Sequence, residues 1–456
     1  MTEEKQLKEK ACKLSVKEGS FYSLMDGFGM RYITPFALAL GAGNVFIGLL
    51  NSLPGFLGNF SQLFTVRMME NKSRKKIVYY GTLFQALLWL PIIAIGLLFF
   101  YQKINLSIAL VSLIGFYTIL VMFGSFISPA WNSWMRDLVP QNKLGEYHGN
   151  RNRIVGSVAL ISMLAAGIIL DYFSGSNIFF GFSLIFLIAF LGRSISAYIF
   201  TKKYEPEIKY EKGYYFTFWG FFKKMPYNNF GRFVIFAGLM SFAVAIASPF
   251  FAVYVLKNLG LGYISYTVIT ISSAVSMLFF MPLWGKFSDK YGDMLTLKIT
   301  GFLVAIVPLM WLFSPLINKE FLVPYLILSE VMSGILWAGF NLSSATFIVT
   351  AVTRQRMGLC VAYDNFVIAG GAFAGAMIGG LLASLDFPII GLKPILFIFL
   401  LSAVARLAVA VVLIPALEEV EVVKKFDIRA VKEMLLTTPR SFWTARGIKR
   451  PGFNTT

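Results

Sequence analysis

The sequence predicts an all-α membrane protein with twelve transmembrane helices, arranged as two six-helix bundles with pseudo-twofold symmetry. Of the 456 residues, 57% are hydrophobic and only 14% are charged, whereas soluble domains carry about 25% charged residues. The apolar residues form long runs, and the basic residues lie in short segments between the runs. The two halves of the chain also resemble each other in one register.

Twelve apolar runs are long enough to cross a bilayer, since a helix needs roughly 20 apolar residues to span about 30 Å of hydrocarbon. The runs at 106–134 and 321–349 are unusually long, and we expect those two helices to tilt or kink. The runs lie near residues 21–42, 45–67, 77–100, 106–134, 153–171, 177–200, 230–256, 264–284, 295–314, 321–349, 361–385 and 394–414.

The runs divide the chain into two bundles joined by a linker. The expected parts are a cytoplasmic N-terminal tail (1–20), a first bundle (21–200), a cytoplasmic linker with an aromatic interfacial segment (201–229), a second bundle (230–414) and a cytoplasmic basic tail (415–456).

The distribution of positive charge supports this topology, because cytoplasmic loops concentrate Lys and Arg. With the N-terminus inside, 34 of the 41 Lys and Arg residues fall in cytoplasmic segments and 4 in external loops. This predicts a multi-pass plasma-membrane protein with both termini in the cytoplasm. The net charge of +18 then reflects topology and contacts with anionic lipid rather than a nucleic-acid partner.

The internal repeat has an offset of 213 residues. Two similar halves in the same orientation are what a transporter needs when one bundle rocks against the other around a central site. The matched pairs are Lys143 with Arg356, Gly145 with Gly358, Asn152 with Asn365, Gly167 with Gly380, and Arg193 with Arg406.

One predicted loop carries Gly285, Asp289, Lys290 and Gly292 in the order G-x-x-x-D-K-x-G. This loop resembles the signature of the major facilitator superfamily, G-x-x-x-D-(R/K)-x-G-(R/K)-(R/K), found between the second and third helices of each half. The two closing basic positions are Asp293 and Met294 instead. An aspartate at a helix end can meet a basic residue or a neighbouring helix N-terminus, and a glycine permits a tight turn. The resemblance implies a cytoplasmic latch that stabilises one access state.

A second stretch resembles the pattern of that superfamily between helices four and five, D-x-x-P followed by a basic and glycine-rich motif. The charged residues of this stretch are Arg136, Asp137, Arg151 and Arg153, and the resemblance implies that they belong to the latch. The loop at 67–76 keeps a basic cluster but lacks the Gly/Asp pattern, and Glu70 could replace the aspartate. The alternative for all these charges is that they only fix the orientation of the chain.

Ionisable residues at membrane depth are costly and usually face a cavity or a partner. Asp26 and Arg31 lie five residues apart in the first run, about 140° apart around a helix axis, so we expect each to face a different group. Asp26 is either a helix-end residue at the interface or a proton carrier or cation contact. Arg31 would be satisfied by an anionic substrate group or by a carboxylate on another helix.

Other polar residues extend the candidate site. Glu330 is a second plausible proton carrier, and Gln62 and Asn341 could hydrogen-bond a substrate or a neighbouring helix. Asp364 aligns with Arg151 in the repeat, which favours an ion pair there.

The repeat also pairs Arg193 with Arg406 on the sixth and twelfth runs. Matched positions favour a structural role, or a role in which both side chains snorkel toward the cytoplasm.

The sequence contains no catalytic or metal-binding constellation that would indicate an enzyme. Its two cysteines are far apart, and His148 is its only histidine, so no metal or other cofactor is expected. We therefore expect a monomeric secondary active transporter that moves a small organic solute by alternating access, coupled to protons. The alternatives are a non-transporting membrane sensor and a lipid-handling membrane protein on the same scaffold.

Overall fold

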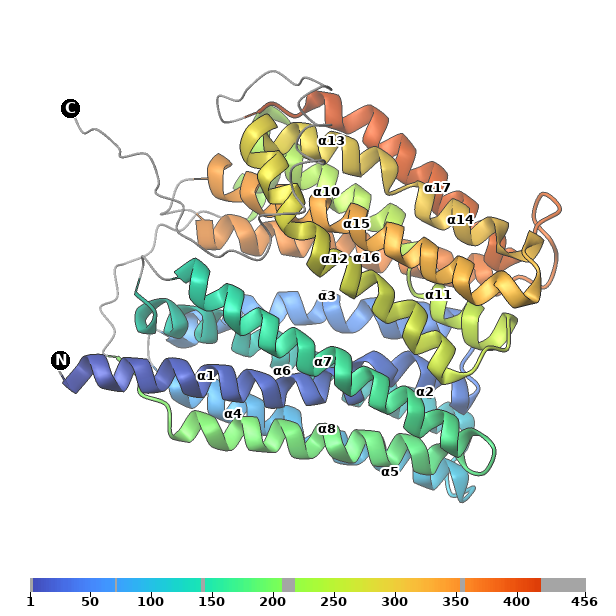
Figure 1. The fold of residues 1–456 in the computed structure, drawn as a ribbon, viewed down its shortest axis with the longest axis horizontal. Coiled ribbons are helices and arrows are strands. Elements are labelled where there is room, and N and C mark those ends of the chain that lie inside the picture. Colours follow the sequence, from blue (N-terminus) through green and yellow to red (C-terminus); the bar gives the residue numbers. More distant parts are fainter. Residues whose placement is uncertain (1–2, 70–71, 141–143, 207–217, 353–356, 420–456) are drawn as a thin grey trace, which may run out of the picture.

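The computed structural model describes residues 3–69, 72–140, 144–206, 218–352 and 357–419. The described residues form helices joined by turns, and the long helices run between two opposite ends of the molecule (Figure 1). We call the end where the first helix begins the N-terminal end, and the opposite end the far end. Glu70, the candidate replacement for the signature aspartate, and most of the expected basic tail (415–456) lie outside the described residues.

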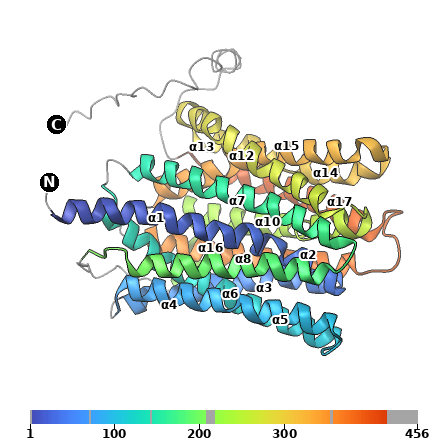
Figure 2. The same cartoon turned by 60° about the horizontal axis from the view of Figure 1, so that its bottom comes forward.

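The helices form two groups that lie side by side, with the first half of the chain in one and the second half in the other (Figures 1 and 2). The first contains α1 (Glu3–Phe28), α2 (Ile33–Leu40), α3 (Asn44–Met69), α4 (Arg74–Leu87), α5 (Trp89–Phe100), α6 (Leu106–Leu138), α7 (Leu144–Ser174) and α8 (Ile178–Thr201). The second contains α9 (Phe218–Lys224), α10 (Asn229–Ala245), α11 (Phe250–Val253), α12 (Tyr263–Tyr291), α13 (Asp293–Leu303), α14 (Ile306–Phe313), α15 (Lys319–Ala351), α16 (Met357–Ala383) and α17 (Pro394–Leu413).

Within the described residues, ten helical segments are long and apolar enough to cross a membrane. Neither α1 nor α3 is among the ten, although runs 21–42 and 45–67 correspond to them. The second half of α1 contains the charged residues Lys17, Glu18 and Asp26, and the helix ends at Phe28. The two longest runs became single helices of 33 residues each, α6 and α15.

The first helix begins earlier than the sequence indicated. Residues expected in an N-terminal tail are helical from Glu3, and Ala11, Ser15 and Glu18 are buried within the first group. This part of α1 packs against α7 and α8. It therefore belongs to the packed bundle.

The first apolar run is not one helix, because it breaks near its middle. A short 3₁₀ turn, Met30–Tyr32, separates α1 from α2. Pro35 lacks the N–H that would bond to the carbonyl of Arg31, and its ring would clash with that carbonyl in a continuous helix. Gly29 allows the backbone to approach Trp89, since a Cβ there would lie 2.4 Å from the indole ring.

Arg193 and Arg406 are buried, with 5% and 2% of their surfaces exposed. Arg193 donates to Gln85 Oε1 at 2.7 Å, which ties α8 to α4. Arg406 donates to the carbonyl of Val304 at 3.1 Å, which ties α17 to the turn between α13 and α14. The expectation that these side chains snorkel is wrong; the structural alternative is right, because buried acceptors satisfy each guanidinium.

Candidate functional site

Asp26 and Arg31 form an ion pair, contrary to the expectation that they would face different groups. Arg31 Nε lies 3.3 Å from Asp26 Oδ2. The 140° separation applies only to a continuous helix, and the break between α1 and α2 removes that geometry. The side chain of Arg31 is 57% exposed and that of Asp26 is 20% exposed. The pair therefore lies on an open face at the break.

This open face is the one that the two groups of helices share. Arg31 interacts electrostatically with Tyr22 of α1 and with Tyr266 of α12, which belongs to the second group. Tyr117 of α6 interacts with both members of the ion pair. The pair is thus surrounded by phenol side chains from both halves of the chain.

Glu330 lies on the other half of the same region. It interacts with Ser273 of α12 and, electrostatically, with Arg406. Tyr266 interacts electrostatically with both Arg31 and Glu330. Tyr266 is thus a neighbour of both Arg31 on the first half and Glu330 on the second half.

Next to this region, the two groups are joined by hydrogen bonds at the far end. The Tyr32 hydroxyl, fully buried, bonds to Thr267 Oγ1 at 2.6 Å and donates to the carbonyl of Met163 at 2.7 Å. Asp171 Oδ1 accepts from the backbone N–H of Tyr263 at 2.6 Å.

Two close backbone approaches lie in the same place. A Cβ at Gly48 would lie 2.5 Å from the carbonyl oxygen of Ala376, and one at Gly380 would lie 3.1 Å from the Cα of Val45. Asn44 donates to the carbonyl of Ala383 at 2.5 Å. We call these contacts the far-end interface: Tyr32, Asn44, Val45, Gly48, Asp171, Tyr263, Thr267, Ala376, Gly380 and Ala383.

One pair of helices, α3 and α16, stays in contact farther toward the N-terminal end. Phe56 packs on Phe366 and Phe373 at ring-centroid distances of 5.5 and 5.6 Å. Asn59 donates to the carbonyl of Asn365 at 3.4 Å. The two groups therefore also touch along the middle of α3 and α16.

The two predicted amides occupy different settings. Gln62 donates to Asn59 Oδ1 on its own helix at 3.2 Å, so it supports the α3–α16 contact through its neighbour. Asn341 is exposed on α15. The structure does not bring either amide into contact with Arg31.

Within the described residues, Asp364 has no ion-pair partner, so the expected interfacial or interdomain ion pair of Asp364 is not found there. Arg151, which occupies the matching position of the first half, lies 3.4 Å from Glu18 and stacks over Trp131 at 4.5 Å. All three partners belong to the first group of helices, so burial within that group decides the pairing. Asp364 is 2% exposed, and its Oδ1 has no hydrogen-bond partner among the described residues.

The loop with the superfamily signature lies at the N-terminal end. Gly292 has φ +96°, a conformation that favours glycine, and donates to the carbonyl of Ser288 at 2.8 Å. Asp289 is exposed, whereas Asp293 is buried at the start of α13 and hydrogen-bonded to Ser288.

The other two signature residues also lie at the surface of this loop region. Gly285 is half-buried, and Lys290 Nζ lies over the ring of Tyr291 at 4.9 Å.

One of the charges after the fourth run, Asp137, pairs with a buried arginine of α4, and others lie at the surface. Asp137 accepts from Arg74 at 2.6 Å, and Arg74 is only 1% exposed and lies 3.6 Å from Glu205. Arg136 is exposed, and Arg153 donates to Asn150 at 3.3 Å. Sequence reasoning noted the basic cluster around Arg74 but did not identify Arg74, Glu205 or Glu18 as partners.

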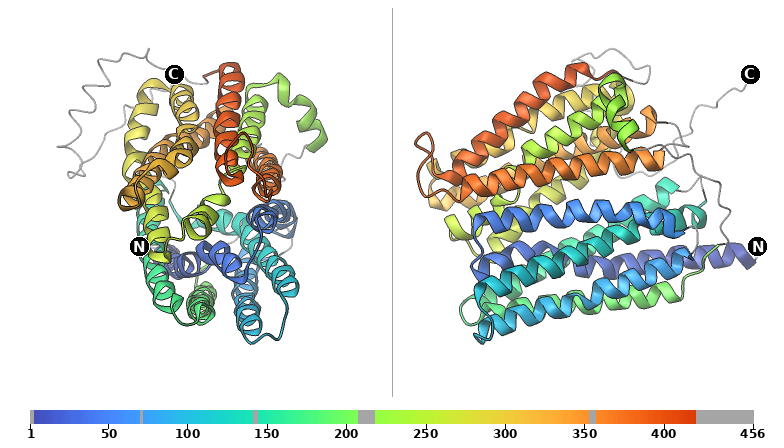
Figure 3. Two further views of the ribbon diagram at one scale, coloured as in Figure 1. Left: turned by 90° about the vertical axis from the view of Figure 1, so that its right-hand side faces the viewer. Right: turned by 180° about the vertical axis from the view of Figure 1, so that it is seen from behind.

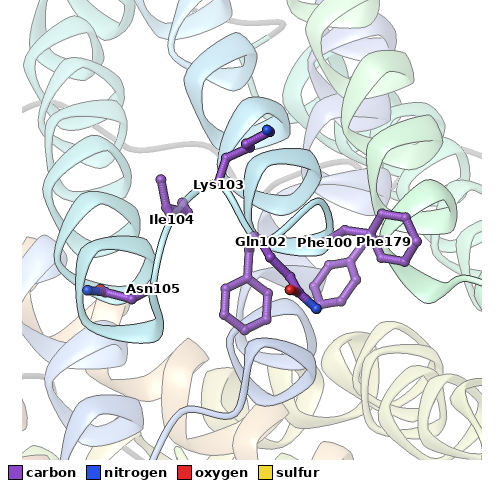
Figure 4. Close-up of a pocket in the computed structure, with 7 residues that line it drawn as sticks. Phe100, Gln102, Lys103, Ile104, Asn105 and Phe179 are labelled. Carbon is purple, nitrogen blue, oxygen red and sulfur yellow. The ribbon is translucent and has the colours of Figure 1, made fainter.

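A separate hollow lies at the loop between α5 and α6, at the far end (Figure 4). Phe100, Lys103 and Phe179 contribute to its lining, and none of its lining residues belongs to the region around Arg31. Within the described residues, no group of three His, Cys, Asp or Glu side chains could hold a metal ion.

The family model for the Major Facilitator Superfamily matches residues 19–359. The chain belongs to the major facilitator superfamily. This major facilitator protein therefore belongs to a family of multi-pass membrane transporters rather than to a family of enzymes.

Comparison with individual proteins adds one sequence relative. The chain is 29% identical over 147 residues to the multi-drug resistance efflux pump PmrA of Streptococcus pneumoniae. The match covers 31% of this chain and 35% of that pump, so it spans about a third of each protein.

Solved structures share the fold. A D-xylose–proton symporter overlaps with a TM-score of 0.69 at 12% identity, covering 92% of this chain and 99% of that one. A bacterial homologue of the iron transporter ferroportin in its inward-facing state overlaps with a TM-score of 0.68 at 13% identity, covering 89% and 98%. A bacterial ferroportin homologue in its outward-facing state, with soaked iron, overlaps with a TM-score of 0.58 at 15% identity, covering 91% of this chain and 99% of that one.

Proposed function

We propose that this protein is a monomeric secondary active transporter that moves a small organic solute across the plasma membrane by alternating access, coupled to protons. In this proposal the chain crosses the bilayer twelve times, and α1–α8 and α10–α17 form two six-helix halves related by a pseudo-twofold axis. The views along and behind the bundle, in which each half occupies one side, agree with this division (Figure 3). α1 with α2, and α3, supply the two crossings beyond the ten apolar segments.

The observation that carries this proposal is the interface between the halves at the far end. Hydrogen bonds and glycine approaches concentrate at the far-end interface, while the ion pair of Asp26 and Arg31 lies beside that interface with an exposed guanidinium. A carrier that alternates access needs a site that is closed off on one side at a time.

The proposed orientation places the N-terminal end, with both termini, in the cytoplasm. The basic residues favour this orientation, since 34 of 41 belong to segments expected there. The described conformation is then closed to the outside and open inward. The larger overlap with the inward-facing ferroportin homologue agrees with that assignment.

The proposed latch belongs to the opposite conformation. Its residues are Gly285, Asp289, Lys290, Gly292, Arg136, Asp137, Arg151 and Arg153. Asp289 and Arg136 are exposed at the N-terminal end, as they would be when that end is open. When the N-terminal ends of the halves meet, these charges would face each other and hold the outward-facing state.

Proton coupling is assigned to Asp26 and Glu330. Asp26 lies near Tyr22 and Glu330 lies near Tyr266, and both tyrosines are neighbours of Arg31. A carboxylate within a membrane protein that faces a cavity is suited to carry a proton between two aqueous sides.

The test begins with a ligand-stabilisation screen of the purified protein, followed by flux of each hit into proteoliposomes with and without a pH gradient. We expect gradient-driven uptake by the wild type, and its loss in Asp26→Asn or Glu330→Gln. Asp386→Asn, an exposed acid at the far end, is the matched control. Binding without flux would favour the sensor alternative, and unchanged gradient dependence in both variants would remove the coupling role of these two acids.

A further inference from the structure

We infer that the Arg31–Asp26 ion pair is the binding site for a singly charged organic anion, a carboxylate, which replaces Asp26 on the Arg31 guanidinium while Asp26 takes up one proton. This inference rests on the proposed transport function and names the solute class that the site selects. Of the two acids proposed for coupling, it assigns to Asp26 the proton taken up when the anion binds.

The geometry leaves Arg31 available to a ligand. A guanidinium carries five N–H donors, and among the described residues Arg31 makes one hydrogen bond, from Nε to Asp26 at 3.3 Å. Charge-assisted bonds are usually about 2.7–2.9 Å long. The pair of the buried Arg74 and the exposed Asp137 reaches 2.6 Å. The contact at Arg31 is longer, and the Arg31 side chain is 57% exposed whereas that of Arg74 is 1% exposed, so the Arg31 guanidinium retains free donors for a carboxylate.

The neighbouring groups leave Asp26 as the acid that balances Arg31. Around the pair, α1 contributes Tyr22, α6 contributes Tyr117 and α12 contributes Tyr266. These phenols are uncharged, and their rings and hydroxyls suit the organic part of a ligand.

The two further cations near Tyr22 have other partners. Arg193 of α8 lies over the Tyr22 ring at 5.0 Å and donates to Gln85, so its charge adds to the positive potential of the region. Arg151 of α7 is paired with Glu18. On the second half, Glu330 interacts with Arg406.

Charge conservation selects an anion over a cation. Arginine does not lose its proton in proteins, whereas a carboxylate can gain one. An organic cation bound to Asp26 would displace Arg31 and leave one added positive charge inside the membrane. An anion bound to Arg31 adds one negative charge, and protonation of Asp26 cancels it.

The exchange is balanced. The contact between Asp26 and Arg31 breaks, a contact between the ligand carboxylate and Arg31 forms, and one proton from solution joins an Asp26 oxygen. Reversal on the other side of the membrane releases both anion and proton. The cycle therefore moves no net charge, and the pH gradient, not the membrane voltage, drives it.

The test uses matched acid and amide probes on the full-length protein in lipid nanodiscs. The pairs are benzoate with benzamide, nicotinate with nicotinamide and lactate with lactamide, alongside neutral sugars and tetraalkylammonium cations. We expect at least one acid to raise the thermal unfolding temperature while its amide does not. Arg31→Gln should weaken that acid's binding about tenfold or more, and Arg232→Gln, an exposed arginine on α10, should leave it unchanged.

Proton uptake is measured by titration calorimetry of the same acid at neutral pH in Hepes and in Tris, which differ in ionisation heat. We expect one proton taken up per bound anion in the wild type and none in Asp26→Asn, whose affinity no longer depends on pH. The wild-type measurement stands even if the variant does not fold.

The outcomes separate this inference from the proposed function. Stabilisation by sugars or cations, with no response to any acid, overturns the anion site but leaves transport intact. Acid binding without proton uptake overturns the role of Asp26. A panel without any binding counts against both proposals.

Discussion

Gly48→Ala places a methyl group where α3 meets α16 in the far-end interface. The added Cβ would lie 2.5 Å from the carbonyl oxygen of Ala376, whereas ordinary contacts begin at 3.4 Å. The two helices must separate by about 1 Å, or deform, to accept it, and overpacking of this kind costs about 1–3 kcal/mol. Only a conformation in which the halves touch at this depth carries that cost.

The substitution should therefore shift the conformational equilibrium toward the state in which the far end is open. By the relation of about 1.4 kcal/mol per tenfold change, the ratio of closed to open far ends should fall about five- to 150-fold. Gly55→Ala is the matched control, because it lies on the same helix and its Cβ would meet nothing within 4 Å. Both variants gain the same helix propensity from alanine.

Distances between spin labels at Lys103 and Ser384 report this equilibrium. Both residues are exposed at the far end, one in each half, and the native cysteines are first replaced by serine. Pulsed electron resonance in nanodiscs should show a larger long-distance population in Gly48→Ala than in Gly55→Ala. Equal distance distributions in the two variants would refute the assignment of Gly48 to a closing interface.

Three further predictions concern hydrogen bonds and charge. Tyr32→Phe removes the buried bonds to Thr267 and Met163, and should open the far end by about 1–2 kcal/mol, read by the same spin labels; an unchanged distribution would contradict it. Asp171→Asn removes a carboxylate from the N-terminus of α12 and should shift the equilibrium in the same direction by about 0.3–1 kcal/mol, with less effect at high salt if the charge is responsible. Burial lowers the pKa of Lys203, beyond the end of α8, to about 8, so the unfolded chain binds more protons above that pH and stability should rise by about 1.4 kcal/mol per pH unit from about pH 8 toward the ordinary lysine value. Thermal unfolding between pH 7 and 10 tests this, and Lys203→Met should remove the rise; a wild-type curve that is flat or falls in this window would rule the mechanism out.

Some features of this protein followed from short stretches of sequence. A crossing of the bilayer is a local property of roughly 20 residues, so the apolar runs and the basic segments between them predicted an all-helical membrane protein. The superfamily followed from the resemblance of the loop with Gly285, Asp289, Lys290 and Gly292 to the superfamily signature. The role of Gly292 in a tight turn also followed from local sequence, since the turn between α12 and α13 places this glycine at a φ of +96°. The twelve crossings, the orientation and the latch remain predictions.

The candidate site was only partly predictable. Asp26, Arg31 and Glu330 were identified because ionisable residues are rare at membrane depth. Their relationship was not, because helical periodicity separates Asp26 from Arg31 and a break in the backbone reunites them. Pro35 and Gly29 were the available signals for that break.

By itself, the sequence determined where this chain is apolar, where it is basic and which charges stand apart from water. Only the tertiary structure decided which residues meet: Arg31 with Asp26, Arg151 with Glu18, and Gly48 with the backbone of α16. The physical reason is that hydrophobicity acts on each segment alone, whereas an ion pair or a close backbone approach depends on positions brought together by the packing of several helices.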